Sequence, residues 1–185
     1  MDALGLRRGD ASYKDTQRLR AYLYLREANA LRALGQNAEA APLGEKELSA
    51  AMASGDGLSI ARAMFSLGTT CMVNGQSERG LKLLDQARPM FEHHDDLEHR
   101  QGLGWWYIVQ ADSVLAGLID RPLEAALECA QTALEILRPL DNWPGVARAH
   151  AARARAYERL GDTRLASVAH SAERMALAMQ DTRAA

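Results

Sequence analysis

The stretch ARAMFSLGTTCMVNGQSERGL, residues 61–81, shares its residue spacing with two other parts of the chain. The matching stretches are AYLYLREANALRALGQNAEAA, residues 21–41, and ARAHAARARAYERLGDTRLAS, residues 147–167. Aligned on their fifteenth residue, all three have a glycine, which we name the turn glycine: Gly35, Gly75 and Gly161. Agreement at fixed spacing over whole segments indicates an internal repeat.

Small residues surround each turn glycine at the same distances, fourteen and seven positions before it and five after it. They are Ala21, Ala28 and Ala40; Ala61, Gly68 and Gly80; and Ala147, Ala154 and Ala166. A glycine supplies the left-handed conformation that ends a helix. Small residues on both sides allow two antiparallel helices to approach closely. Apolar residues at intervals of three and four give each helix an inward face. The repeated unit is therefore predicted to be a helical hairpin.

A further hairpin is expected between the second and the last turn glycine, which are eighty-six residues apart, whereas the first two are forty apart. It corresponds to residues 102–137, with a second helix from Pro122, since proline is tolerated in a first turn. The spacing leaves the register of its first helix open by about one turn. We expect an N-terminal extension at 1–14 and one domain at 15–185, with units at about 15–55, 56–95, 96–140 and 141–181.

This arrangement resembles the tetratricopeptide repeat family, on the small residues at the helix crossings, the turn glycine and RPLEAALECAQTAL, residues 121–134, as a second helix. The period of about forty is similar to that of the longer MalT-like subgroup, in which a GD…G.A.A…LG phrase opens each repeat. Residues 53–68 and 139–162 are similar to this phrase in part. The resemblance implies an all-α, right-handed superhelix of about four hairpins and eight helices. Glu47 and Glu173 depart from the family where a neighbouring repeat normally packs, which indicates polar or terminal surfaces there.

The resemblance also implies a function in binding. Repeats of this subgroup form the sensor or scaffold part of bacterial signalling and transcription regulators, and the chain is expected to bind a protein or peptide without catalysis. The first helices would line a groove that is apolar at one end and rich in arginine at the other, suited to a partner with an acidic segment. The expected groove residues are Tyr22, Leu25, Asn29, Arg32, Arg62, Phe65, Thr69, Met72, Arg148, Arg155 and Arg159. The alternative is that the arginines are solvated or pair with Glu158 and Glu173.

The only aromatic cluster is Trp105, Trp106 and Tyr107. Consecutive residues on a helix point about 100° apart, so at least one of the three is expected to face the groove or a neighbouring chain. Trp105 and Trp106 are therefore added to the candidate binding residues. Packing of these side chains within the repeat is an equally good alternative.

FEHHDDLEHR, residues 91–100, gathers seven groups able to bind a metal or a proton. We interpret it as a joint between hairpins. Asp96 lies forty residues after Asp56, and Asn142 takes the same place before the last hairpin, so all three are expected to cap the next helix. His93 and His94 would then lie at the end of the preceding helix, where an imidazole meets the partial negative charge of the carbonyls.

No catalytic, cofactor or metal residues are predicted. The chain contains no Gly-x-Ser-x-Gly, P-loop, Rossmann or HExxH pattern, and we expect a protein that is not an enzyme. His150 is expected to be a core histidine. Two remaining alternatives are a sensor of a small ligand or peptide pheromone and a structural module for homo-oligomerisation.

Charge and hydropathy argue against other partners. A net charge of -2, from 22 basic and 24 acidic residues, provides no electrostatic basis for direct nucleic-acid binding. No apolar run reaches the ~20 residues that span a bilayer, and the N-terminal residues have no signal-peptide pattern. Two isolated cysteines, Cys71 and Cys129, fit a reducing compartment. The expectation is a cytoplasmic protein without membrane partners.

Overall fold

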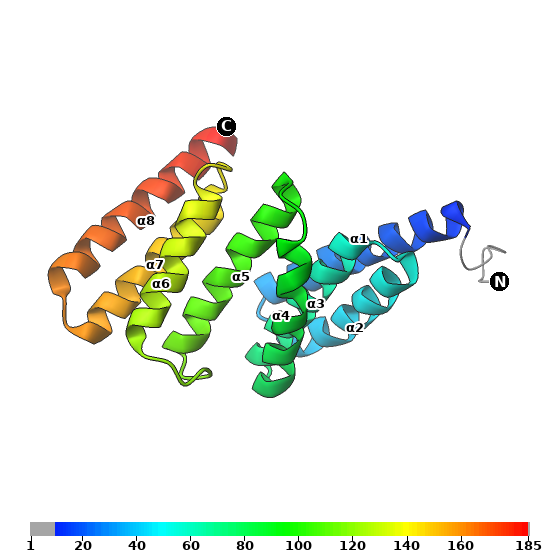
Figure 1. Cartoon of the computed structure of the whole chain (residues 1–185), viewed down its shortest axis with the longest axis horizontal. Helices are drawn as coiled ribbons and strands as arrows, with labels where there is room; N and C mark the ends of the chain where they lie inside the picture. Colours follow the sequence, from blue (N-terminus) through cyan, green and yellow to red (C-terminus); the bar gives the residue numbers. More distant parts are fainter. Residues whose placement is uncertain (1–9, 185) are drawn as a thin grey trace. The chain divides into compact units, whose positions relative to one another are not determined.

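The computed structural model describes residues 10–184, and within that range the only regular elements are eight α-helices (Figure 1). They are α1 (Ala11–Ala33), α2 (Asn37–Ser54), α3 (Gly57–Val73), α4 (Ser77–Glu92), α5 (Leu97–Leu115), α6 (Leu123–Leu137), α7 (Trp143–Leu160) and α8 (Thr163–Ala184). The predicted all-α class is confirmed. None of these helices combines the length and the apolar character needed to cross a membrane.

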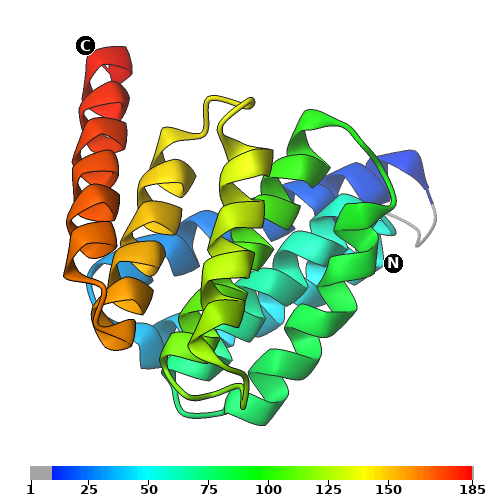
Figure 2. The same cartoon turned by 60° about the vertical axis from the view of Figure 1, so that its left-hand side comes forward.

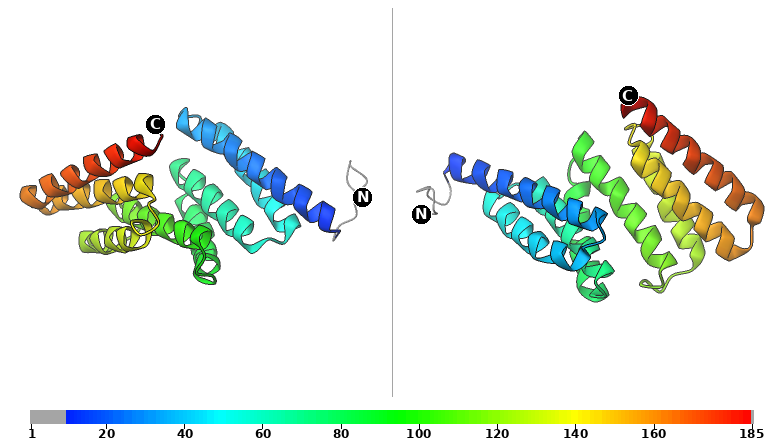
Figure 3. Two further views of the ribbon diagram at one scale, coloured as in Figure 1. Left: turned by 90° about the horizontal axis from the view of Figure 1, so that it is seen from above. Right: turned by 180° about the vertical axis from the view of Figure 1, so that it is seen from behind.

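The chain divides into two compact units, one that ends at His93 and holds α1 to α4, and one that begins at His94 and holds α5 to α8. In each unit, consecutive helices pair as hairpins, and the second helix of one hairpin packs on the first helix of the next, α2 on α3 and α6 on α7. Figures 2 and 3 show the α7–α8 hairpin from further sides. Within each unit the first helices also touch, α1 with α3 and α5 with α7. This packing is consistent with a hairpin-repeat superhelix.

The first helix begins at Ala11, inside the stretch expected to be an N-terminal extension. Residues 1–9 of that stretch lie outside the described residues.

The turn glycines end the first helices as predicted. Gly35, Gly75 and Gly161 have φ angles of 77°, 78° and 81°. In each case the N–H of the next residue donates to the carbonyl five residues before it, for example Gln76 to Cys71 at 2.8 Å. This is the Schellman arrangement, which satisfies carbonyls that a helix end leaves unpaired. Gly117 makes the same turn, with φ 70° and a bond from Leu118 to Ser113. It is the fourth turn glycine, which spacing alone had not aligned.

All nine small residues of the repeat are buried. The second hairpin shows why they must be small, because a Cβ atom on Gly68 would lie 3.0 Å from the Gly80 carbonyl oxygen. In the third hairpin Gly104 and Ala111 take these places, seven residues apart like the other pairs. A Cβ atom on Gly104 would lie 2.5 Å from Leu137 of α6. These two residues fix the register of α5. They lie thirteen and six positions before Gly117, one residue fewer than in the other hairpins.

The three predicted caps are confirmed. The side chain of Asp56 accepts a hydrogen bond from the Ser59 N–H, Asp96 from Glu98 and His99, and Asn142 from Gly145 at 3.0 Å. Burial by itself would raise the pKa of Asp56, but its hydrogen bonds with Ser59 outweigh that effect and lower it.

Removing one cap provides a direct test of this local account. Asn142→Ala should lower the free energy of unfolding by about 1 kcal/mol, because the orphan N–H of Gly145 loses its acceptor. Asn142→Asp keeps an acceptor oxygen and should be as stable as the parent within about 0.5 kcal/mol. Urea denaturation of both variants measures the difference, and equal loss in both would show that the side chain does not act as a cap.

Candidate binding surfaces

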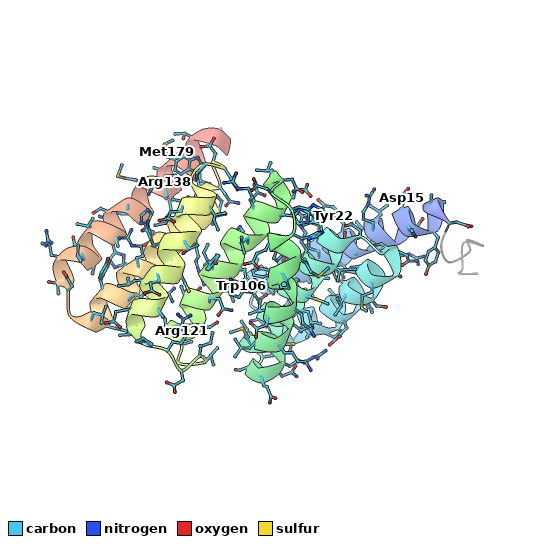
Figure 4. All side chains as sticks on the ribbon, viewed as in Figure 1. Asp15, Tyr22, Trp106, Arg121, Arg138 and Met179 are labelled. Atoms are coloured by element: carbon cyan, nitrogen blue, oxygen red, sulfur yellow. The ribbon has the colours of Figure 1, made fainter. Side chains whose placement is uncertain are left out.

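The candidate residues lie on the first helices of the hairpins. Those of the first unit form what we name the α1–α3 face: Tyr22, Leu25, Asn29, Arg32, Arg62, Phe65, Thr69 and Met72. Those of the second unit form the α5–α7 face: Trp105, Trp106, Arg148, Arg155 and Arg159. Figure 4 shows the side chains on the ribbon, with Tyr22 and Trp106 labelled.

Arg32 occupies an internal position on the α1–α3 face. Its Nη1 donates to the Ser66 carbonyl oxygen at 3.0 Å and to the hydroxyls of Thr69 and Thr70 at 3.2 and 3.1 Å. Its Nη2 donates to the side-chain oxygen of Asn29. Burial lowers the pKa of Arg32, although a guanidinium keeps its charge in proteins. The structure therefore brings Asn29, Arg32 and Thr69 together, and it uses the guanidinium to hold α1 against α3.

Glu47 lies close to this network, between α2 and α3. Its side chain is hydrogen-bonded with Ser66, the residue is 2% exposed, and its Oε2 has no hydrogen-bond partner among the described residues. Burial raises the pKa of Glu47 to about 7, against the opposing effects of Ser66 and of the Arg32 charge. The expectation of a polar or terminal surface at Glu47 is wrong, because α3 covers this position. Glu173, the matching residue of α8, is partly exposed.

The apolar residues of the α1–α3 face differ in how much of their surface is exposed. Tyr22 is 55% exposed. Phe65 is half-buried and packs edge-on against Phe91, with ring centroids 6.3 Å apart. The Met72 side chain lies against Gly80 of α4. Tyr22 is thus the residue of this group with the most surface available for contact.

Two further members of the α1–α3 face, Leu25 and Arg62, are also half-buried. The charge of Arg62 acts on Asp56, the residue that caps α3, and contributes to the lowered pKa of that carboxyl. Neither side chain is among the large exposed groups of this face.

The α5–α7 face is organised by Asp112. One oxygen of this carboxylate accepts hydrogen bonds from Arg148, at 2.9 Å from Nη2, and the other accepts from Arg155. Arg159 donates to the Leu115 carbonyl oxygen. The side chains of Arg148 and Arg155 remain 57% and 45% exposed, whereas that of Asp112 is 22% exposed. Three guanidiniums and one carboxylate leave a formal charge of +3 − 1 = +2 on these four residues.

The arginines of the α5–α7 face pair with groups on α5, whereas the sequence had suggested Glu158 and Glu173 as partners. These two glutamates are hydrogen-bonded with His170. Oε1 of Glu158 lies 2.9 Å from its Nε2, and Oε2 of Glu173 lies 3.3 Å from its Nδ1. The arginines pair across to α5 and fix the spacing of the two first helices.

Asp112 was not among the sequence-derived candidates. Once Gly104 and Ala111 are aligned with Ala147 and Ala154, Asp112 takes the same position as Arg155. The small pair seven residues apart was the signal that could have identified it.

The aromatic cluster serves mainly in packing. Trp106 is 5% exposed and its ring contacts Tyr107 edge-on, with centroids 5.1 Å apart. Trp105 and Tyr107 are half-buried against the core formed by α5, α6 and α7, which includes Leu137 and Val146. The packing alternative therefore describes this cluster better than an exposed anchor.

The histidines differ in their surroundings. Nδ1 of His99 lies 2.7 Å from Asp96, and the hydrogen bond lowers the pKa of that carboxyl. The rings of His94 and His99 lie 4.8 Å apart, and His93 follows the last residue of α4. Burial lowers the pKa of His150 to about 4, so this core histidine is neutral at pH 7. Within residues 10–184 no three His, Cys, Asp or Glu side chains are placed to hold a metal ion.

Comparison with models of known protein families finds no match for this chain. Comparison with curated protein sequences finds none either.

Proposed function

We propose that this chain is a non-catalytic binding module of the tetratricopeptide type, whose α5–α7 face holds an acidic segment of a protein or peptide partner. By the same resemblance, it would act as the sensor or scaffold part of a bacterial cytoplasmic regulator of the MalT-like kind. The observation that carries the binding proposal is the pair of half-exposed arginines that share Asp112.

Arg148 and Arg155 share the carboxylate of Asp112, and this arrangement favours binding of a second carboxylate, from the partner. Asp112 holds both guanidiniums in place, so less side-chain entropy is lost when a ligand binds. A guanidinium presents five N–H donors in a planar fork that matches a carboxylate, and Asp112 uses only part of this capacity. The formal surplus of positive charge attracts an acidic side chain or a chain terminus.

Arg32 has a different role in this proposal. Its donors are already directed at Ser66, Thr69 and Thr70, and it stabilises the first unit instead of meeting the partner. Tyr22, with more than half of its surface open, is the most exposed apolar residue of the α1–α3 face.

A pocket of about 260 Å³ lies between α6 and α7, lined by Gln131, Leu134, Glu135, Arg138, Pro139 and Arg153. Ligand pockets generally have volumes of about 300–1,000 Å³. The volume of this pocket lies just below that range.

A peptide array of random sequences, probed with the labelled chain, tests the proposal. Bound peptides should be enriched in Asp and Glu. The double variant Arg148→Ala/Arg155→Ala should bind them at least about tenfold more weakly, because a hydrogen bond to a charged group contributes about 1.5–3 kcal/mol. The matched control is Arg164→Ala, an exposed arginine on α8, which should bind like the parent. No enrichment of acidic peptides, or the same loss in the control, would contradict the proposal.

A further inference from the structure

Within each unit, one side of the first helix of the second hairpin is covered by the hairpin before it, α3 by α2 and α7 by α6. On α3 the residues of this side are buried under α2: Ala63, Ser66 and Leu67. The same positions, counted back from the turn glycine, are exposed on α1: Leu23, Arg26 and Glu27. Leu23 is 57% exposed, and Leu19 and Leu34 on the same side are 59% and 75% exposed. The first helix thus presents the surface on which a second helix normally packs.

The last helix presents the opposite surface. On α2 the residues that face α3 are buried: Gly44, Glu47 and Ala51. The same positions, counted forward from the turn glycine, are partly or largely exposed on α8: His170, Glu173 and Leu177. Leu177 is 45% exposed, and the side chains of His170 and Glu173 are 41% and 28% exposed.

The α2–α3 contact shows which of these positions meet. Ser66 is hydrogen-bonded with Glu47. A Cβ atom on Gly44 would lie 3.0 Å from Leu67 Cδ1. Ala63 belongs to the same core cluster as Ala51. The register of one hairpin on the next is therefore known residue by residue.

We propose that α1 of a second copy of this chain docks on α8, so that the hairpin repeat continues from one copy to the next. In the α2–α3 register, Arg26 of one copy comes opposite Glu173 of the other. Glu27 comes opposite His170, and Leu23 opposite Leu177. Arg26 and Glu173 have opposite charges, Glu27 comes opposite an imidazole, and the apolar pair buries leucines that are now exposed to water.

The surroundings of His170 favour its cationic form, which suits this pairing. Its Nε2 lies 2.9 Å from Glu158 and its Nδ1 lies 3.3 Å from Glu173. Hydrogen bonds with these two carboxylates raise the pKa of His170. When protonated, the imidazole gives Glu27 a cationic partner.

The two docking surfaces differ, so the contact is heterologous. After two copies pair, one of them keeps a free α1 surface and the other a free α8 surface, so further copies can add at either end. The average mass should therefore rise with concentration and not level off at a dimer.

Sedimentation velocity of the full 185-residue chain, from micromolar to near-millimolar concentration, tests the proposal together with two variants. Leu23→Glu blocks the α1 surface and Leu177→Glu blocks the α8 surface, so each variant alone should sediment as a monomer. Mixed in equal amounts, they retain one intact surface of each kind and should form a dimer that grows no further. Circular dichroism checks that both variants fold.

Val168→Glu is the control, because Val168 is 60% exposed on α8 at a position that is also exposed on α2 and α4. It should associate like the parent. Arg26→Glu and Glu173→Arg should each weaken association at least about tenfold, and the two changes together should restore it. A parent chain that stays monomeric throughout, a mixture that does not dimerise, or single variants that associate like the parent would overturn the proposal.

Discussion

Gly80→Ala should lower the free energy of unfolding by about 2 kcal/mol, although alanine is the better helix former. An added Cβ atom would lie 2.7 Å from the Gly68 carbonyl oxygen of the facing helix. That oxygen belongs to the backbone, so relief requires α3 and α4 to move apart, and overpacking of this kind costs about 1–3 kcal/mol. Thermal or urea unfolding measures the effect.

Gly57→Ala is the matched control, since no atom lies within 4 Å of a Cβ atom at Gly57 in α3. There the change should stabilise the protein by at most about 0.5 kcal/mol, because Gly57 is the first residue of α3 and the full gain of about 0.5–1 kcal/mol applies inside a helix. If both alanines act in the same direction, the close crossing of α3 and α4 is not the structural core of the repeat.

Glu47→Gln should stabilise the protein by about 3 kcal/mol above pH 7 and by almost nothing below pH 4. The folded pKa of about 7 exceeds the usual value of 4.5, so the folded state holds a proton that the unfolded chain has already released between these two pH values. The stability of the parent should therefore fall as the pH rises from about 4.5 to about 7. Glutamine carries no charge and removes this loss, whose size follows from about 1.4 kcal/mol for each pH unit.

Urea denaturation at a series of pH values measures the difference between parent and variant. Glu45→Gln, on the exposed side of α2, should change stability by less than about 1 kcal/mol, as expected for a surface pair with Arg79. A Glu47→Gln advantage that stays constant or shrinks as the pH rises would contradict the buried position of this carboxyl.

The fold could be predicted because its determinants are local. Gly35, Gly75 and Gly161 end helices by their own conformational freedom, and Asp56, Asp96 and Asn142 cap helices within three residues of themselves. Small residues at the crossings follow from the same periodicity. Such signals depend on residues that are close together in the sequence, so they can be recognised from the sequence alone.

The partners of the charged side chains could not be predicted in the same way. Arg32 binds hydroxyls on α3, and Arg148 and Arg155 share Asp112 on α5. These pairs are separated by 36 to 43 residues along the chain. A shift of one residue in α5 decides whether Asp112 faces α7, and the one-residue offset between the small pair Gly104/Ala111 and Gly117 hid that register.

Glu47 shows a second limit of prediction from the sequence. A glutamate at a packing position suggested a surface, because burying a charge is costly. In the folded chain the cost is reduced by a hydrogen bond with Ser66, by the nearby charge of Arg32 and by a raised pKa. These compensating groups come from two other helices.

The most direct test of the central claim is the affinity of an acidic peptide for the α5–α7 face. Calorimetric titration would use the tightest acidic peptide from the array against the parent, Arg148→Ala/Arg155→Ala and Arg164→Ala. The account predicts that the double variant binds at least about tenfold more weakly, that Arg164→Ala binds like the parent, and that added salt weakens binding to the parent. Equal affinity of the parent and the double variant would contradict it.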